Sequence, residues 1–260
     1  MDTMHDGDIE ERIRRDGFAV VGKVLDDATI ATMRASLQDA IDHDIEQWSG
    51  NPWYRDHWMV HNLMLRHEVF MQFLENPVMH AYLSRLLSES CIVYAYTSSS
   101  LPANGSNYSR RIHVDAQAKC LDYITNVGVL VALDDFTDEN GATYYLPGSQ
   151  TSLDVPDEER FFANAVRVYP RAGEAVIFNA RTFHYGGVNT TDRPRHAITL
   201  NVCRQWMKQR FDYPAMLTED QLSSLGPVGR RFIGMDSRIP RNLEEYYVAP
   251  EQRLFKSSAD

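Results

Sequence analysis

Hydrophobic positions in the first third of the chain recur with a helical period. Between residues 26 and 44 an apolar side chain returns every three or four positions, and Asp26 or Asp27 suits the N-cap of a helix. The same criteria predict a short helix at about 8–15, an apolar β-branched strand at 17–25 and a second amphipathic helix at 78–87.

The pattern changes near residue 91 to short segments of the kind that form β-strands. Strands are expected at 91–97, 123–134, 142–146, 165–169, 175–179 and 195–206. Turn signals such as Asn140-Gly141 separate them. Helices followed by many short strands predict a mainly β protein with flanking α-helices. Its core is expected to be a double-stranded β-helix, a cupin-like jelly roll, with the helices packed on the outside of one sheet.

The length and the absence of repeats or linkers predict a single domain over residues 1–260. We expect a helical N-terminal part at about 1–90, a jelly-roll core at about 91–210 and a C-terminal segment at about 211–260. That last segment is mixed and polar, and it is expected to wrap the barrel or cover its mouth.

The charge balance limits the classes of partner. A net charge of -10 disfavours nucleic acid and anionic membrane surfaces, and it argues mildly against a large polyanionic substrate. A local basic patch could override this, and its candidate members are Arg110, Arg111, Arg204, Lys208 and Arg210.

The cysteine content and the N-terminal sequence bear on the compartment. Three widely spaced cysteines fit neither a disulfide framework nor a cysteine zinc site. The polar, acidic stretch 1–15 lacks the apolar segment of a signal peptide, and no apolar run is long enough to span a membrane. We therefore expect a soluble cytoplasmic protein, monomeric or homodimeric, that acts on a small molecule.

Candidate chemistry centres on His113-Val114-Asp115. On a strand, residues two apart point to the same face, so an imidazole and a carboxylate share one space. His184, in a later strand-like stretch, supplies a second imidazole if the jelly roll brings the two strands together. Two histidines and one carboxylate are diagnostic of a non-haem Fe(II) site. Taken alone, His113 is more simply read as a hydrogen-bonded histidine of a sheet.

Arg195 adds to this set because it begins the strand that follows His184. A guanidinium inside a barrel needs an anionic partner, and a carboxylate co-substrate is one such partner. The alternative is a structural salt bridge with an Asp or Glu of the fold. Arg193 is a second candidate, but Arg195 is preferred. His57 and His61 also have metal-ligand spacing, but a surface or packing role is favoured for them.

These residues give the chain a resemblance to the phytanoyl-CoA dioxygenase-like family of Fe(II)/2-oxoglutarate oxygenases. The resemblance rests on DGFAVV at 16–21, HVD at 113–115, ALDDFTDENGATYYLPGSQ at 132–150, GEAVIFNARTFHYGGVN at 173–189 and RPR at 193–195, and more loosely on RNLEEYY at 241–247. It covers nearly the whole chain, and the ordered combination of motifs is far more specific than any one of them.

The resemblance implies roles for individual residues. His113, Asp115 and His184 would bind iron, and Arg195 would bind the distal carboxylate of 2-oxoglutarate. Thr143, Tyr96 and Ser98 would be further contacts of this co-substrate. The implied reaction consumes O2, releases succinate and CO2, and hydroxylates a C–H bond. Asp115 favours hydroxylation over halogenation, whereas desaturation, epoxidation and ring formation stay open.

The sequence says less about the substrate. Arg181, Tyr185 and Trp206 are candidate pocket residues because they flank the expected site, and 48–58 and 151–164 are candidate lids. A natural product or an amino-acid derivative is favoured over a CoA ester. Two alternatives remain: a cupin-like metalloprotein that uses no keto acid, and a non-catalytic ligand-binding jelly roll.

Overall fold

The structure is a computed structural model that describes residues 6–55, 57–117 and 120–256. Its strands are β1 (Phe18–Lys23), β2 (Ile92–Ser98), β3 (Asn126–Ala132), β4 (Thr143–Tyr145), β5 (Val166–Val168), β6 (Glu174–Asn179), β7 (His184–Tyr185) and β8 (Ala197–Cys203). Its α-helices are α1 (Asp6–Asp16), α2 (Asp27–Trp48), α3 (Glu68–Phe73), α4 (Pro77–Leu86), α5 (Glu158–Asn164), α6 (Tyr213–Met216), α7 (Glu219–Ser224), α8 (Pro227–Phe232) and α9 (Leu243–Tyr246). Short 3-10 helices lie at Leu63–Leu65, Ser149–Thr151 and Pro250–Gln252.

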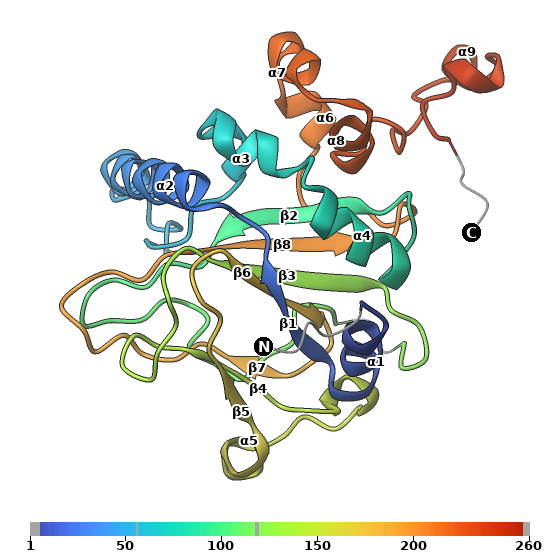
Figure 1. Ribbon diagram of the computed structural model, residues 1–260. Helices are drawn as coiled ribbons and strands as arrows, with labels where there is room; N and C mark the ends of the chain where they lie inside the picture. The colour runs from blue at the N-terminus through green and yellow to red at the C-terminus, as the bar shows by residue number, and fades with distance from the viewer. Residues whose placement is uncertain (1–5, 56, 118–119, 257–260) are drawn as a thin grey trace.

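Two antiparallel sheets form the centre of the molecule. The larger has the strand order β1-β6-β3-β8-β2, and the smaller has the order β5-β4-β7. The larger sheet carries helices α2, α3 and α4 on one face, and the smaller sheet lies toward its other face (Figure 1). This is the predicted jelly-roll arrangement, with the helices outside one sheet.

The large sheet is buried on both faces, and successive residues of its strands alternate between two apolar clusters. Val127, Val129 and Val131 of β3 point toward the helices, where they join one extensive core. Leu130 and Ala132 point the other way, into a smaller cluster between the two sheets. The space between the sheets is therefore lined by the second set of side chains, and the candidate site lies there.

The longest helix begins and packs as its sequence predicts. The Asp26 carboxylate accepts a hydrogen bond from the Thr29 backbone N–H at 2.7 Å, which caps α2. The four residues of its apolar stripe, Ile30, Met33, Leu37 and Ile41, are all buried in the core. The helix runs on to Trp48, past the end that the sequence predicts.

Turns that the sequence marks with glycine are present as expected. Gly141 has φ +85°, a left-handed conformation that glycine adopts at little steric cost. The Asn140 side chain accepts from Thr137 N–H at 2.8 Å and donates to the Asp135 carbonyl at 2.7 Å, closing the same turn. This NGA segment is thus a structural element that delivers the chain into β4.

Two segments differ from the expectation. The stretch 151–164, expected as a loop, contains α5, which is capped by Asp157. The last part of the chain forms α6, α7 and α8, whose apolar residues join the helix-side core. These helices lie beyond the β2 edge of the large sheet (Figure 1). No helix in the described part of the chain is long and apolar enough to cross a membrane.

Candidate active site

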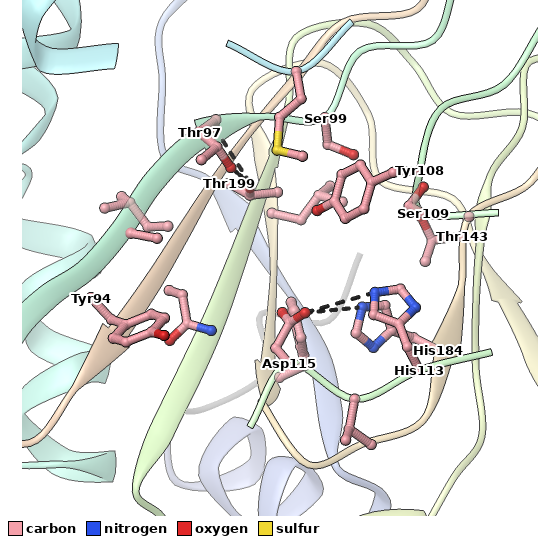
Figure 2. Close-up of a pocket in the computed structure, with 18 of the residues that line it drawn as sticks. Tyr94, Thr97, Ser99, Tyr108, Ser109, His113, Asp115, Thr143, His184 and Thr199 are labelled. Carbon is pink, nitrogen blue, oxygen red and sulfur yellow. Dashed lines mark hydrogen bonds and ion pairs between the residues drawn. The ribbon is translucent and has the colours of Figure 1, made fainter. Parts of the chain in front are cut away.

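Three side chains distant in the sequence meet in the space between the sheets. His113, Asp115 and His184 each offer one ligand atom, and these atoms all lie within 4.8 Å of one another. The Asp115 Oδ1 is 3.7 Å from His113 Nε2 and 3.9 Å from His184 Nε2 (Figure 2). Within the described ranges this is the one such group of metal-binding side chains.

Backbone pairing between two short segments produces this convergence. His113 and His184 form an isolated antiparallel bridge, with His113 N–H donating to His184 O at 3.1 Å and His184 N–H donating to His113 O at 2.9 Å. Asp115 N–H in turn donates to Ala180 O at 2.8 Å. His113 lies outside the regular strands, but its extended pairing still places His113 and Asp115 on one side, as their spacing predicts.

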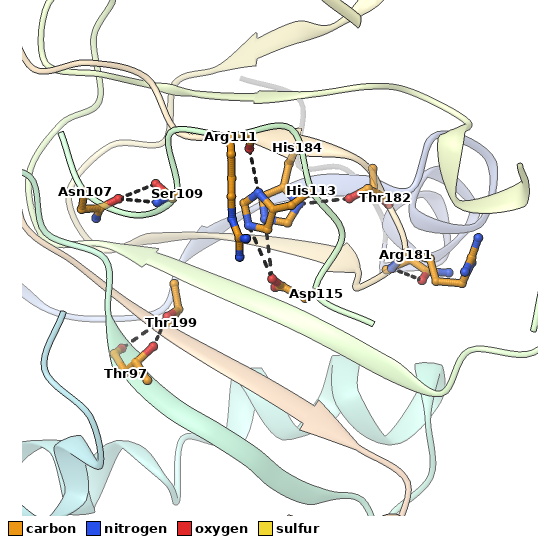
Figure 3. Close-up of polar contacts among 11 residues, drawn as sticks. Thr97, Asn107, Ser109, Arg111, His113, Asp115, Arg181, Thr182, His184 and Thr199 are labelled. Atoms are coloured by element: carbon orange, nitrogen blue, oxygen red, sulfur yellow. Dashed lines mark hydrogen bonds and ion pairs between the residues drawn. The ribbon is translucent and has the colours of Figure 1, made fainter. Parts of the chain in front are cut away.

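Both imidazoles are oriented by the carbonyl two residues earlier. His113 Nδ1 lies 2.8 Å from Arg111 O, and His184 Nδ1 lies 3.0 Å from Thr182 O (Figure 3). A carbonyl can only accept, so both Nδ1 atoms carry a proton, and Nε2 is the nitrogen of each ring that faces Asp115 and is placed to bind a metal. Burial, reinforced by the neighbouring His184, lowers the pKa of His113 to about 4, so this ring is neutral at pH 7.

The donor set fits a divalent first-row metal. Two imidazole nitrogens and one carboxylate oxygen form the facial arrangement typical of non-haem Fe(II), which leaves coordination positions open. The hydrogen bonds at Nδ1 fix the tautomer and the orientation that a metal-binding imidazole requires. The site therefore has both the ligands and their supporting contacts.

Arg195 is the second notable feature, because its guanidinium is buried and only one of its three nitrogens has a hydrogen-bond partner. It is 3% exposed, donates from Nη2 to Ser99 O at 3.0 Å and lies over the Phe136 ring at 4.1 Å. Its Nε and Nη1 are buried without a hydrogen-bond partner. Burial lowers the pKa of this guanidinium, and the carboxylate of Asp134 opposes that effect. A buried cation with two nitrogens that lack a hydrogen-bond partner suits a carboxylate ligand.

Arg193, by contrast, has a side chain that is 90% exposed beside Asp192. The structure therefore separates the two candidate arginines, since only Arg195 is buried. Asp134 forms its salt bridge with Arg34 at 2.9 Å and accepts from His196 N–H at 2.7 Å, so its carboxylate has structural partners.

A cavity of about 620 Å³ opens beside the three ligand side chains. This volume lies within the range of small-molecule sites. Thr143 lines it, as expected, and so does Tyr145, whose ring stacks on His184 with centroids 5.7 Å apart. Burial, together with the Asp115 carboxylate, raises the pKa of Tyr145, so its phenol is protonated at neutral pH.

Tyr96 and Ser98 do not reach the cavity. Tyr96 is fully buried on the helix side of β2, against Phe70 and Phe73. The Ser98 hydroxyl accepts from Val60 N–H at 2.9 Å and thereby holds the segment before the first 3-10 helix. The alternate residues Thr97 and Ser99 line the cavity instead. The expectation had the correct strand but the wrong face.

The three candidate substrate residues also lie outside the cavity lining. Arg181 is buried and donates to the carbonyls of Gln150 at 3.3 Å and Ser152 at 2.8 Å, and these bonds fix the segment 150–152. Tyr185 packs against Tyr144 and Phe162 on the side of β7 opposite His184. Trp206 is 60% exposed beyond the end of β8. Arg181 therefore acts as a structural anchor.

The other histidines have local roles. His57 and His61 are not on a helix, so the metal-ligand spacing between them is not realised. His61 pairs with Thr97 as an isolated bridge. His196 is buried, and its Nδ1 lies 3.0 Å from Ser100 Oγ. This hydrogen bond accounts for the buried imidazole without a metal.

Sequence reasoning missed several residues of the cavity wall. Tyr145 and Thr199 both line it, and the hydroxyls of Thr97 and Thr199 lie 2.8 Å apart across the two strands (Figure 2). A signal for Tyr145 was present, because it lies two residues after Thr143 and so shares its face of the strand. Arg111 likewise precedes His113 by two residues and lines the cavity.

Comparison with known proteins agrees with the geometry of this site. Residues 13–197 match the model of the family described as phytanoyl-CoA dioxygenase (PhyH). The chain is 29% identical over 255 residues to the uncharacterised protein Rv1501 of Mycobacterium tuberculosis, covering 95% of this chain and 93% of that protein. It is 28% identical over 190 residues to the Fe(II)/2-oxoglutarate-dependent dioxygenase nvfF of Aspergillus novofumigatus, covering 68% of this chain and 61% of the relative.

Solved structures share the fold. The non-haem monooxygenase ThoJ superposes with a TM-score of 0.63 at 22% identity, over 78% of this chain and 80% of ThoJ. The epimerase SnoN, solved with Fe3+, α-ketoglutarate and nogalamycin RO, superposes with a TM-score of 0.60 at 21% identity, over 77% of this chain and 84% of SnoN. The chain therefore belongs to the phytanoyl-CoA dioxygenase family and is an oxygenase of the Fe(II)/2-oxoglutarate type.

Proposed function

We propose that this protein hydroxylates, or otherwise oxidises, an unactivated C–H bond of a small molecule and releases succinate and CO2. The observation that carries the proposal is the convergence of His113, Asp115 and His184 in the same inter-sheet space as a buried guanidinium with two unpartnered N–H groups. A cupin-like metalloprotein that uses no keto acid would gain nothing from burying Arg195 in this state, because an unpaired buried charge is costly.

In this proposal each residue has a defined task. His113 and His184 bind Fe(II) through Nε2, and Asp115 binds it through its carboxylate. The bound iron, with 2-oxoglutarate and O2 as co-substrates, supplies the oxidising chemistry. The chain orients both imidazoles through the carbonyls of Arg111 and Thr182.

Arg195 holds the distal carboxylate of 2-oxoglutarate. Its Nε and Nη1 are the free donors, and the Ser99 carbonyl and the Phe136 ring fix the remaining guanidinium surface. Thr143 lines the same cavity and contributes a hydroxyl to the co-substrate. Tyr145 closes one side of the site, since its ring stacks on His184 and excludes water from that face.

The substrate is a compact organic molecule, and a natural product or an amino-acid derivative is favoured. The cavity volume of about 620 Å³ is shared between the co-substrate and the substrate. The name of the structural neighbour SnoN refers to nogalamycin biosynthesis, which supports a natural-product substrate by analogy. Asp115 occupies the position of the carboxylate ligand, which favours oxygen insertion over halogenation.

We also propose that the chain acts as one domain. The N-terminal helices, the large sheet and α6–α8 share one continuous apolar core, so no boundary between separately folded parts is evident in the described residues.

The decisive experiment is the measurement of succinate formed from 2-oxoglutarate by the Fe(II)-loaded protein in air. Uncoupled turnover above the level of an Asp115→Ala control is expected. No succinate, with Fe(II) or Mn(II) bound tightly, would instead favour a metalloprotein without a keto acid. Absence of both succinate and metal binding would favour a non-catalytic jelly roll.

A further inference from the structure

Two arginines line the cavity in addition to the metal-binding triad. Of the charged side chains that line it, Arg111 and Arg210 are the ones not assigned to the metal site. They come from separate parts of the chain, one just before His113 and one after β8. The walls of the candidate substrate space therefore carry a net positive charge apart from the metal and its ligands.

Neither guanidinium forms a salt bridge with a carboxylate among the described residues. The chain has 36 acidic and 26 basic residues, so carboxylates are abundant. Many of its arginines use them: ion pairs are formed by Arg15, Arg34, Arg66, Arg85, Arg167, Arg193 and Arg241. Among the described residues neither Arg111 nor Arg210 has such a pair, although both lie at the cavity.

The backbone at both positions is fixed while the charged ends stay free. Arg111 N–H donates to Ser109 O at 2.7 Å, and its guanidinium lies 6.0 Å from the centre of the Tyr108 ring. Arg210 N–H donates to Tyr94 O at 3.0 Å. In Figure 3 the Arg111 side chain runs beside the two imidazoles. Both guanidiniums are therefore carried by backbone positions that are held by hydrogen bonds.

2-Oxoglutarate does not account for these two arginines. 2-Oxoglutarate has two carboxylates. The proposed function already places one of them at the metal and the other, distal one at Arg195. The organic substrate is the remaining occupant of the cavity, and an anionic group on it would complement the charge of Arg111 and Arg210.

The part of the lining that comes from β2 and β8 is polar and uncharged. It includes Thr97, Thr199 and Asn201, and the threonine hydroxyls are hydrogen-bonded to each other. Such groups recognise hydroxyls, amides or carbonyls of a ligand and offer no counter-charge to a cation. The lining thus fits a molecule that is anionic at one end and hydrogen-bonding along its body.

We propose that Arg111 and Arg210 together bind an anionic oxygen group of the organic substrate, so that the enzyme acts on small organic acids: carboxylates or phosphate monoesters. This inference rests on the proposed function, since it assigns the substrate class of the same site. A guanidinium binds the oxygens of either anion in a bidentate manner, so the two sources share one chemistry. The experiment below separates them.

The test measures binding to the full-length protein loaded with Mn(II) and N-oxalylglycine, an unreactive analogue of 2-oxoglutarate, by titration calorimetry. The carboxylate arm compares phenylacetate, 4-hydroxyphenylacetate and N-acetylleucine with their primary amides. The phosphate arm compares phenyl phosphate with phenol. In at least one arm the wild-type protein is expected to bind the anion about 10–100-fold more tightly than its neutral counterpart, the range typical of hydrogen bonds to charged groups.

The arginine variants then assign the preference. The variant R111Q/R210Q is expected to bind the anion no more tightly than its neutral counterpart. Its melting temperature should equal that of the wild-type protein, because both side chains are exposed. R193Q, which removes an exposed arginine outside the cavity, is expected to retain the preference for the anion. If no anion binds the wild-type protein more tightly than its neutral partner, or if R111Q/R210Q keeps the preference, the proposal is overturned. Succinate formation by the wild-type protein is scored separately, so failure here is distinct from failure of the proposed function.

Discussion

Each residue of the triad has a support that fixes its geometry before a metal binds. The imidazoles are held by backbone carbonyls, and the Asp115 backbone is held by Ala180. Backbone partners are independent of side-chain rotamers, so they hold the three ligand atoms near one another at little entropic cost. The triad is therefore preorganised for metal.

Replacing a triad residue tests this at the scale of one side chain. Asp115→Ala is expected to weaken Mn(II) affinity by more than about 100-fold, because even the outer partners of metal ligands contribute about 10–100-fold. Isothermal titration under anaerobic conditions measures the affinity. His57→Ala is the matched control, since His57 is exposed and outside the group of ligands, and it should bind metal as the wild-type protein does. Equal affinities of the wild-type protein and Asp115→Ala would contradict the assignment.

Arg195 allows a second prediction, which separates binding of the co-substrate from stability. Arg195→Met is expected to raise the KM for 2-oxoglutarate by about 10–150-fold, equivalent to a loss of about 1.5–3 kcal/mol from charge-assisted hydrogen bonds. The protein without co-substrate should stay as stable as the wild type, because the variant also removes the cost of burying a half-satisfied guanidinium.

Steady-state succinate assays and thermal unfolding with and without 2-oxoglutarate measure the two effects. The wild-type protein should be stabilised by the keto acid, and Arg195→Met should not. Arg193→Met serves as the control because its guanidinium is solvent-exposed. An unchanged KM in Arg195→Met would place the distal carboxylate elsewhere.

At the scale of secondary-structure elements, a close approach between β3 and β6 supports the metal site. Gly128 pairs with Phe178, and the phenyl ring lies over the glycine, so an added Cβ would meet its Cζ at 2.1 Å. The same ring is 5.2 Å from that of His184. Glycine at this strand position thus makes room for the aromatic ring that backs a metal ligand.

Gly128→Ala is therefore expected to lower the free energy of unfolding by about 1–3 kcal/mol, the usual cost of overpacking a core. It should also weaken metal binding, since Phe178 must move from His184. Gly22→Ala on β1 is the control, because its added methyl group meets nothing within 4 Å, and it should change stability by less than about 0.5 kcal/mol. Urea unfolding compares the two, and equal stabilities would refute the packing argument.

The succession of strands along the chain and the shared face of His113 and Asp115 could be predicted from the sequence, because both depend on local spacing, whereas the place of His184 beside them rested on the family resemblance. The pattern HVD requires only that alternate residues share a face. The faces of β2 could not be predicted in the same way, since that strand is apolar on both sides and its register shifts between Val93 and Ala95. A shift of one residue exchanges the faces, which is why Thr97 and Ser99, not Tyr96 and Ser98, line the cavity.

The substrate-facing residues were harder to predict for a related reason. Arg210 reaches the cavity from an irregular segment after β8, and no periodicity fixes the direction of such a segment. Arg181 and Tyr185 flank His184 in sequence, yet neighbours of an inward residue on a strand point outward. Short helices such as α6 and α8 were missed because each has fewer than two turns of periodic sequence.

At the scale of the whole molecule, the helices and the large sheet form a rigid support, and the chemistry lies on the opposite face of that sheet. One apolar core joins the N-terminal helices, all five strands of the large sheet and the C-terminal helices. The small sheet closes over the remaining face and brings His184 and Thr143 into the cavity. The acidic overall charge contrasts with the basic lining beside the metal site.

The most direct test is a crystal structure of the protein grown without oxygen in the presence of Mn(II) and 2-oxoglutarate, with anomalous diffraction to locate the metal. We expect one metal ion bound by Nε2 of His113, Nε2 of His184 and the Asp115 carboxylate, and the keto acid's distal carboxylate at the Arg195 guanidinium. A metal bound by other residues, or a keto acid whose distal carboxylate lies away from Arg195, would contradict the account.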